Sequence, residues 1–444
     1  MSATVPPTGL WCARGNKADL LLRGPRVVDP AAGIDAVADV LVQKGKVAAV
    51  GAGLVAPEGV RVIDAAGMLA LPGFVDLHTH LRTPGREDEE DLSTGTAAAA
   101  AGGYVAVFGM ANTDPVTDTA AVFEALARRA AAEATVPVGF YAAVSKGLAG
   151  RELTEMHELA AAGVVGFSDD GMPITSAYLL RRALQYARPT GRFVAVHAED
   201  RTLSGTGVMH EGEVSAQLGL GGVPSIAEST EVGRDVEIAG YEEARLHVCH
   251  VSTAAALAHV VRAKEAGVPV TAEVTPHHLT CTHELLRELD PNTKMNPPLR
   301  EESDRRALVD ALAGGQIDCV ATDHAPHALQ EKEVPLEEAP FGTIGLETAF
   351  AVLHERLVVP GALPLAALVE RMSQAPARIA RITVPSLAAG EQANLCLVDP
   401  RARWTVDRHT LHSRSQNSFL WGATLGARVL LTVAAGRVAH DAVA

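Results

Sequence analysis

Two histidines one residue apart, His78 and His80 in the run DLHTH, carry the clearest chemical signal of the sequence. Side chains alternate across a β-strand, so both rings face the same side if this run ends a strand. Two imidazoles at that spacing can hold one metal ion. The alternative is a pair of ordinary core histidines, but polar rings turned into a core need hydrogen-bond partners. The pattern therefore predicts a metal site.

More residues that could bind a metal follow other apolar runs in the chain. They are Asp169 and Asp170 in GFSDDG, His197 in FVAVHAED, His250 in LHVCHVS and Asp323 in VATDHAPH. One aspartate after a strand would be unremarkable. Several such residues are hard to explain as packing, because loops at the carboxyl ends of parallel barrel strands form active sites. We expect these side chains to converge.

The elements that must position them form a repeating pattern between about residues 71 and 384. The predicted strands are Phe74–His80, Tyr104–Met110, Val138–Val144, Val164–Ser168, Phe193–His197, Leu246–Val251, Val268–Val274 and Cys319–Thr322. The predicted helices are Ala120–Ala134, Glu152–Ala162, Ala177–Ala187, Ala254–Ala266, Asp304–Ala313 and Leu346–Arg356. Eight strands alternating with helices indicate an α/β fold with a parallel (β/α)8 barrel.

The two ends of the chain read as short strands separated by Gly, Pro and Asp, which is typical of β-structure. Neither end supplies enough strands to bury a core alone. We therefore predict that residues 1–70 and 385–444 together form one small β-sandwich domain beside a barrel of residues 71–384.

Composition excludes several classes of function. The net charge of −15 argues against a nucleic-acid partner, which needs a basic surface. Five cysteines without a C-x-x-C pair are typical of reduced thiols in a cytoplasmic protein. The start of the chain shows no signal peptide, and the apolar stretch Ala97–Met110 is too short to span a membrane.

The motifs LPGFVDLHTHLR, GFSDDG, HAED, HVSTA and TDHAPH resemble the amidohydrolase superfamily, and specifically the larger, multidomain bacterial dihydroorotases. Their order with ANTDPVTD, EVTPHHL and MNPPLR makes the resemblance specific, and it covers nearly the whole chain. It implies a zinc-dependent, reversible cyclisation of N-carbamoyl-L-aspartate to (S)-dihydroorotate in pyrimidine (UMP) biosynthesis.

The resemblance also implies the metal ligands: His78, His80 and Asp323 for one zinc ion, with His197 and His250 for a second. Many relatives bridge the two metals with a carbamylated lysine, but the fourth strand here offers none. The resemblance implies Asp170 as the bridge. Asp169 would point to the opposite side of an extended strand. The sequence leaves one or two zinc ions open.

Asp323 is expected to be the catalytic residue, which takes a proton from hydroxide and passes it to the departing ring nitrogen. Arg82, two residues after His80, is expected to bind the carboxylate of dihydroorotate through a two-pronged hydrogen bond. The alternative for Arg82 is a surface pairing with one of the acidic residues in 87–91. The resemblance adds these contacts to the substrate: His80, Asn112, His327, Asn296, Phe341 and Gly342.

Two neighbouring features have plainer interpretations. Strand alternation that points His250 inward would turn Cys249 away, as a small core residue. The charged segment Ala328–Pro340 is either a mobile loop that covers the site or an ordinary exposed loop.

Two other functions compete with the main one. A hydantoinase or allantoinase is the first, although such relatives usually carry the bridging lysine. The second is a non-catalytic dihydroorotase-like scaffold for aspartate transcarbamoylase, but such proteins tend to lose metal ligands. We expect a homo-oligomer, and a complex with that transcarbamoylase stays open.

Overall fold

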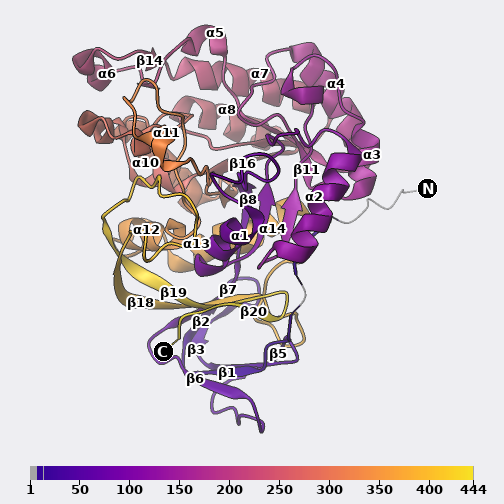
Figure 1. The fold of residues 1–444 in the computed structure, drawn as a ribbon, viewed down its shortest axis with the longest axis vertical. Coiled ribbons are helices and arrows are strands. Elements are labelled where there is room, and N and C mark those ends of the chain that lie inside the picture. The colour runs from indigo at the N-terminus through magenta and orange to yellow at the C-terminus, as the bar shows by residue number, and fades with distance from the viewer. Residues whose placement is uncertain (1–7, 14, 444) are drawn as a thin grey trace.

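The computed structural model describes residues 8–13 and 15–443, so residues 1–7 and 14 of the predicted N-terminal segment and residue 444 lie outside the described residues. A wall of short parallel strands occupies the upper part of the molecule (Figure 1). These strands are β8 (Phe74–Thr79), β9 (Tyr104–Gly109), β10 (Val138–Phe140), β11 (Gly166–Ser168), β12 (Phe193–Val196), β15 (Leu246–Val248), β16 (Val270–Val274) and β17 (Cys319–Val320).

The strands pair in the order in which they occur in the chain. One set runs β8, β9, β10 and the other β11, β12, β15, β16, β17. Parallel bridges between Ala142 and Phe167 and between Thr79 and His324 join the two sets. The His80 N–H also donates to the His324 carbonyl at 2.8 Å, next to the second bridge. The eight strands therefore close into a barrel.

Helices follow the barrel strands and cover the outside of the wall (Figure 1). The longer ones are α1 (Leu92–Ala101), α2 (Ala120–Glu133), α3 (Met156–Ala162), α4 (Ala177–Ala187), α7 (Ile226–Glu242), α8 (Ala254–Glu265) and α10 (Glu302–Gly314). Helix α4 shows why they dock: Leu180, Ala183, Leu184 and Ala187 are buried along one face. Their spacing of three and four residues gives one apolar stripe.

Shorter elements fill the loops above and below the barrel. They are α5 (Arg201–Ser204), α6 (Glu213–Leu218), α9 (Pro276–Thr280), α11 (Leu329–Lys332), α12 (Ala349–Leu353), α13 (Leu365–Val369), α14 (Ala375–Ala380), β13 (Met209–His210) and β14 (Gly222–Val223). Among the described residues, no helix combines the length and the apolar composition needed to cross a bilayer.

The two chain ends build a pair of sheets below the barrel (Figure 1). One has the order β5-β4-β1-β6 and the other β20-β19-β18-β7-β2-β3. Their bounds are β1 (Leu20–Arg23), β2 (Arg26–Asp29), β3 (Ile34–Val37), β4 (Asp39–Gln43), β5 (Lys46–Gly51), β6 (Arg61–Asp64), β7 (Leu69–Pro72), β18 (Leu395–Thr405), β19 (Thr424–Ala434) and β20 (Arg437–Asp441).

Strand β7 from the N-terminal part pairs antiparallel with β18 from the C-terminal part, with Leu69 opposite Val398. The two sheets share one core that contains Leu20, Val40, Leu395 and Leu431. Neither chain end could bury these side chains alone. The predicted fold class, a (β/α)8 barrel with a small β-sandwich domain from both chain ends, is confirmed.

Candidate metal centre and substrate pocket

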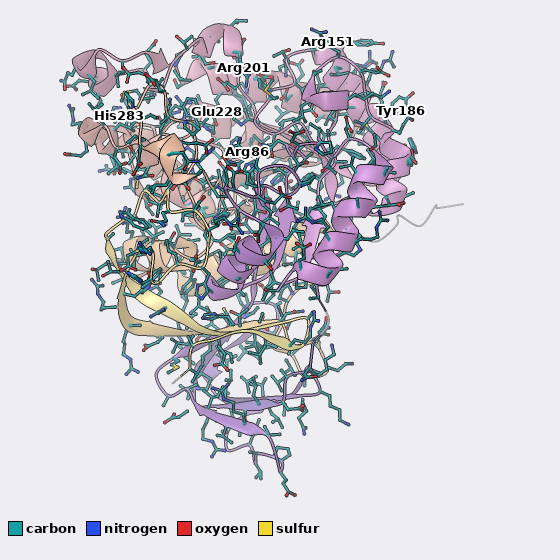
Figure 2. The ribbon with its side chains drawn as sticks, in the orientation of Figure 1. Arg86, Arg151, Tyr186, Arg201, Glu228 and His283 are labelled. Carbon is teal, nitrogen blue, oxygen red and sulfur yellow. The ribbon has the colours of Figure 1, made fainter. Side chains whose placement is uncertain are left out.

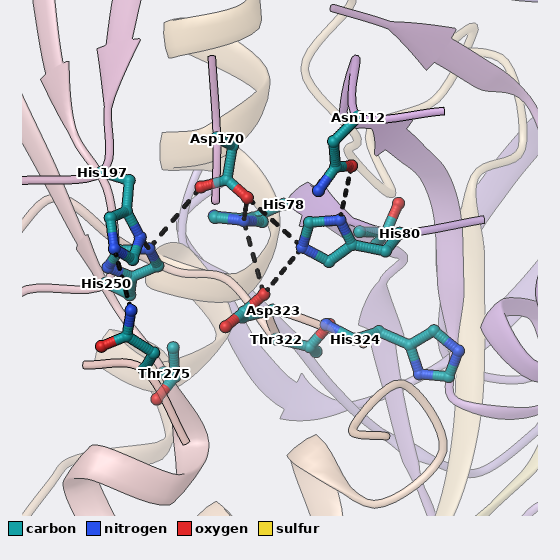
Figure 3. Close-up of polar contacts among 12 residues, drawn as sticks. His78, His80, Asn112, Asp170, His197, His250, Thr275, Thr322, Asp323 and His324 are labelled. Carbon is teal, nitrogen blue, oxygen red and sulfur yellow. Dashed lines mark hydrogen bonds and ion pairs between the residues drawn. The ribbon is translucent and has the colours of Figure 1, made fainter. Parts of the chain in front are cut away.

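The predicted metal ligands, which lie far apart in the sequence, meet at one mouth of the barrel (Figure 3). The ligand atoms of His78, His80 and Asp323 lie within 4.8 Å of one another, and so do those of Asp170, His197 and His250. All follow or end a barrel strand, where the loops begin. The structure thus gathers two adjacent groups of three nitrogen and oxygen donors.

Asp170 lies between the two groups and turns one oxygen toward each. Its Oδ2 is 3.4 Å from Nε2 of both His78 and His80. Its Oδ1 is 3.7 Å from Nε2 of His250, which in turn lies 3.0 Å from Nδ1 of His197. On the other side of the first group, Asp323 Oδ1 is 3.1 Å from His80 Nε2. A carboxylate in this position can serve both groups.

Two atoms of this cluster show that its residues fit a metal ion. His78 Nε2 and Asp170 Oδ1 are buried and have no hydrogen-bond partner among the described residues. Buried polar atoms in proteins are almost always paired. Imidazole nitrogens and carboxylate oxygens that face one point are the donor set that zinc prefers. The donor chemistry of the cluster therefore fits a bound zinc ion.

The charges in the cluster favour a cation at its centre. Burial opposes ionisation of Asp323, but His78 and His80 outweigh it and hold the pKa of this carboxyl well below its usual range. Burial likewise disfavours a charged His78, yet Asp170 and Asp323 raise its pKa well above the ordinary value. Opposite charges at such distances stabilise each other. Asp170 and Asp323 would stabilise a metal ion in the same way.

The backbone turns sharply at several of these positions. Asp323 has φ +49°, His250 has φ +32° and Arg82 has φ +55°, all in the left-handed region. Non-glycine residues there are strained, and such strain gathers at functional sites. The turns aim these side chains at the barrel mouth after their strands have ended.

Cys249 is a buried core residue, as predicted, but the predicted direction of its side chain is wrong for this reason. Its sulfur lies within 4.8 Å of ligand atoms of His78 and Asp170, so it faces the cluster. Strand β15 ends at Val248, and the positive φ at His250 breaks the alternation on which the prediction depended. Burial raises the pKa of the Cys249 thiol, which keeps it protonated.

The neighbouring carboxylates Asp169 and Asp170 point in different directions. Asp169 Oδ1 accepts the backbone N–H groups of Val144 and Ser145 at 2.7 and 3.0 Å. Its Oδ2 accepts the Ser145 hydroxyl at 2.5 Å. Asp169 therefore ties down the loop after β10, while Asp170 faces the two donor groups.

A pocket of about 530 Å³ opens above the cluster. All residues predicted to contact the substrate line it: His80, Arg82, Asn112, Asn296, His327, Phe341 and Gly342. Glu199 and Arg201 also line it. Arg201 comes from the upper, barrel part of the molecule, far from the β-sandwich (Figure 2).

Arg82 is mostly buried in the wall of this pocket. Its Nε lies 2.8 Å from Glu89 Oε2 and donates to the Pro326 carbonyl at 3.0 Å. The pairing with an acidic residue of 87–91 therefore exists, but inside the pocket wall and not on the surface. Glu89 Oε1 lies 3.2 Å from Nδ1 of His327, whose Nε2 donates to the Phe341 carbonyl at 2.8 Å.

Two asparagines contact the histidine ligands from the pocket side. Asn112 Oδ1 lies 3.0 Å from Nδ1 of His80, so this nitrogen donates and leaves Nε2 free for a metal. The Asn296 amide donates to Glu199 Oε2 at 3.0 Å and lies 3.2 Å from Nε2 of His197. Asn112 thus orients an imidazole, and Asn296 holds Glu199, the carboxylate that contacts the His197 ring; both also line the pocket.

Sequence reasoning missed two carboxylates that contact predicted ligands. Glu199 Oε2 lies 3.3 Å from His197 Nε2, and Glu273 Oε1 lies 2.7 Å from His78 Nδ1. Burial would raise the pKa of Glu199, but His197, Ser204 and Asn296 lower it to about 2. Signals existed: Glu199 stands two residues after His197, and Glu273 interrupts the apolar strand VTAEV.

The loop Ala328–Pro340 reaches the pocket at its last residue, Pro340, which is part of the pocket lining. Its Lys332 and Leu336 are buried, and the Lys332 ammonium donates to the carbonyls of Pro291 and Pro340 at 3.0 and 2.7 Å. Glu331 pairs with Arg86 at 2.7 Å. The segment is therefore packed onto the barrel by specific contacts, and much of it is not exposed.

Known proteins resemble this chain over nearly its whole length. Residues 67–256 match the family described as Dihydro-orotase-like. The dihydroorotase of Geobacter metallireducens is 45% identical over 95% of this chain and 99% of its own length. That of Anaeromyxobacter dehalogenans strain 2CP-1 is 47% identical over 95% and 98%.

Solved structures show the same architecture. The L-hydantoinase (dihydropyrimidinase) of Arthrobacter aurescens has a TM-score of 0.85 at 26% identity, with 96% of each chain covered. The dihydropyrimidinase of Brevibacillus agri has a TM-score of 0.81 at 25% identity, with 95% of each chain covered. The likeness in sequence to the dihydroorotases is much closer and spans both the barrel and the β-sandwich. The chain belongs to the dihydroorotase family.

Proposed function

We propose that this protein is a zinc-dependent dihydroorotase that interconverts N-carbamoyl-L-aspartate and (S)-dihydroorotate in cytoplasmic pyrimidine biosynthesis. One observation carries the proposal: six nitrogen and oxygen donors converge on the floor of a pocket whose wall holds a buried arginine. The donors at the floor can hold a metal ion that activates an amide, and the arginine in the wall can bind a ring that carries a carboxylate. The full-length likeness to dihydroorotases supports both parts.

Zinc would be held by His78, His80 and Asp323, with Asp170 shared toward a second position at His197 and His250. When bound there, zinc would act as a Lewis acid on the amide or carboxyl oxygen and make hydroxide available at neutral pH. Asn112 and Glu199 would keep His80 and His197 in the tautomers that a ligand needs, because each contacts the ring nitrogen that faces away.

Asp323 would move the proton that the reaction requires. In ring opening it would take the proton of the attacking hydroxide and give it to the departing ring nitrogen. In ring closure it would take the proton of the ureido nitrogen as that nitrogen attacks the carboxyl carbon, and give it to the carboxyl oxygen that leaves as hydroxide when its C–O bond breaks. Asp323 is held as a carboxylate by His78 and His80, and the carboxylate is the form that can accept a proton.

Arg82 would bind the carboxylate on the dihydroorotate ring, helped by Asn112 and His327 across the same wall. Glu89 and the Pro326 carbonyl occupy Nε of the guanidinium, and Nη2 lies 3.4 Å from His327 Nε2, so an anion would bind at the Nη side beside His327. The rings of hydantoin and allantoin carry no such carboxylate. This feature favours dihydroorotase over the other cyclic amidohydrolases.

Turnover of three cyclic amides tests the assignment. The value of kcat/KM for dihydroorotate should exceed that for hydantoin or allantoin by about 10⁴-fold, because Arg82 would have no ring carboxylate to bind in the latter two. Steady-state assays at one pH and one zinc concentration would measure it. Equal or faster turnover of hydantoin would contradict the proposal, and no turnover of any ring by zinc-loaded protein would favour a scaffold.

A further inference from the structure

A carboxylate lies inside the barrel beneath the metal centre, where ionised groups are rare. Glu273 belongs to β16, and both its side chain and that of His247 on the adjacent strand β15 are fully buried. An ionised carboxylate in such a place is costly unless hydrogen bonds and opposite charge compensate it. The proposed catalytic steps do not use either residue.

Both oxygens of Glu273 are engaged by imidazoles. Oε1 lies 2.7 Å from Nδ1 of His78, and Oε2 lies 3.0 Å from Nε2 of His247. The other nitrogen of His247, Nδ1, lies 2.8 Å from the Thr271 hydroxyl. These four side chains form a continuous chain of hydrogen bonds that leads from β16 and β15 to the predicted ligand on β8.

If the rings of His78 and His247 are both neutral, this series of hydrogen bonds allows only one arrangement of their protons. A carboxylate only accepts, so Nδ1 of His78 and Nε2 of His247 must both carry hydrogen. His247 then presents a lone pair at Nδ1, which accepts the Thr271 hydroxyl. His78 presents its lone pair at Nε2, the atom that lies 3.4 Å from both Asp170 and Asp323. That tautomer is the one that a metal ligand requires.

Histidine, glutamate and cysteine side chains also come together here as His247, Glu273 and Cys319, which could in principle hold a further metal. Two observations oppose that use. Both nitrogens of His247 and both oxygens of Glu273 already have partners. All three side chains are buried in the barrel core. The arrangement fits a support for His78 better than a second binding site.

The other predicted histidine ligands have different partners at the ring nitrogen that faces away from the metal position. His80 contacts the neutral Asn112, and His250 Nδ1 is buried without a hydrogen-bond partner among the described residues. His197 is backed by Glu199, but that carboxylate lines the open pocket. Asp76 is also buried nearby, but it accepts the backbone N–H of His78, whereas Glu273 is the buried carboxylate that contacts the ring of a ligand in the first donor group.

We propose that Glu273 is a positioning residue for the metal centre, which fixes the tautomer and direction of His78 and adds negative charge behind it, with His247 and Thr271 holding Glu273 in place. The inference rests on the proposed function, because it assumes that His78 binds the metal. Carboxylates behind metal-binding histidines raise their basicity, and their loss typically weakens metal binding by about 10–100-fold.

The test is zinc affinity of full-length Glu273→Gln protein, measured in metal-stripped samples by competition with a chromogenic chelator. Gln keeps the size of the side chain but removes the charge and one acceptor. We expect the zinc dissociation constant to rise by about 10–100-fold. The visible spectrum of the cobalt-substituted protein should change too, because the ligand field at His78 changes. A wild-type zinc affinity and cobalt spectrum in Glu273→Gln would overturn the proposal.

A matched control is Glu90→Gln. Glu90 is equally buried and lies 3.3 Å from Nε2 of His324, an imidazole outside the two donor groups. This variant should lose a comparable amount of thermal stability but keep its zinc affinity within about twofold. An equal loss of zinc affinity in both variants would show a general effect of core damage and would also overturn the proposal.

If Glu273→Gln does not fold, two substitutions of His247 test the same series of hydrogen bonds. Gln at this position can still donate an N–H to Glu273, and Leu cannot. His247→Leu should therefore bind zinc more weakly than His247→Gln. If both variants bound zinc with the affinity of the wild type, the proposed support of His78 through Glu273 and His247 would be refuted. These binding measurements need no substrate. If the wild-type protein bound zinc but did not turn over dihydroorotate, the proposed function would be contradicted, independently of the role of Glu273.

Discussion

Asp323→Asn protein should turn over dihydroorotate about 10²–10⁴-fold more slowly than the wild type while it still binds zinc, because an amide cannot take the proton. The amide oxygen can still face the metal, and the remaining donors of its group, His78 and His80, are unchanged. The loss should be similar in ring opening and ring closure, since one carboxylate would serve both directions. Measurements of kcat in both directions, together with zinc content, would check this.

The exposed Asp310 on α10 provides the control for that experiment. Asp310→Asn makes the same chemical change far from the cluster and should leave kcat and zinc content unchanged. Near-normal kcat in zinc-loaded Asp323→Asn would contradict the acid–base role. Loss of both zinc and turnover would mean that Asp323 matters mainly as a ligand.

Arg82→Met protein should have a KM for dihydroorotate raised by roughly 10²-fold or more, because a buried ion pair with the substrate would lose its cation. Dihydrouracil, the same ring without the carboxylate, should show little change. The difference between the two substrates isolates the carboxylate from any general disturbance of the pocket. Steady-state kinetics with both rings would measure it.

Arg86→Met separates this effect from the loss of an ion pair. Arg86 also contacts Glu89, at 2.8 Å, but it is half exposed and does not line the pocket. This variant should leave both KM values near the wild type. If Arg82→Met changed the two rings equally, the carboxylate clamp would be refuted.

The barrel was predictable because buried parallel strands read as short apolar runs. The eight strands were expected at the right places, although several end earlier than expected. Val138–Val144, for example, stops as a strand at Phe140. The N–H of Val144 is taken by the Asp169 carboxylate instead of a neighbouring strand. Tyr141 and Ala142 still donate to the carbonyls of Gly109 and Gly166, but beyond them a carboxylate that follows the neighbouring strand takes the place of a strand partner, which local periodicity cannot reveal.

Helix α7, the longest in the described chain, was not predicted. Its buried face includes Glu228, Glu231 and Asp235, so the apolar period of three and four residues is hidden by carboxylates. Arg234 pairs with two of them, Glu231 and Asp235, at 2.6 and 2.7 Å, and such pairing makes their burial tolerable. Only the tertiary structure supplies that compensation.

The residues of the candidate site were easier to anticipate than their surroundings. His78 lies near the end of a strand, His80 and Asp170 follow strands, all in recognisable motifs, and strand ends converge in this fold. Glu273 and Cys249 could not be placed, because their roles depend on residues brought near by other strands and on a left-handed turn at His250. Sequence motifs can therefore predict the ligands at the strand ends, whereas the residues that hold those ligands in place depend on tertiary contacts.

Zinc-dependent dihydroorotase activity is tested most directly by measuring dihydroorotate turnover as a function of zinc in chelator-stripped protein. We expect one or two zinc ions per chain in purified protein, loss of turnover when they are removed, and recovery in proportion to zinc added back. Metal analysis on the same samples would give the stoichiometry. Full turnover by protein shown to be free of metal would contradict it.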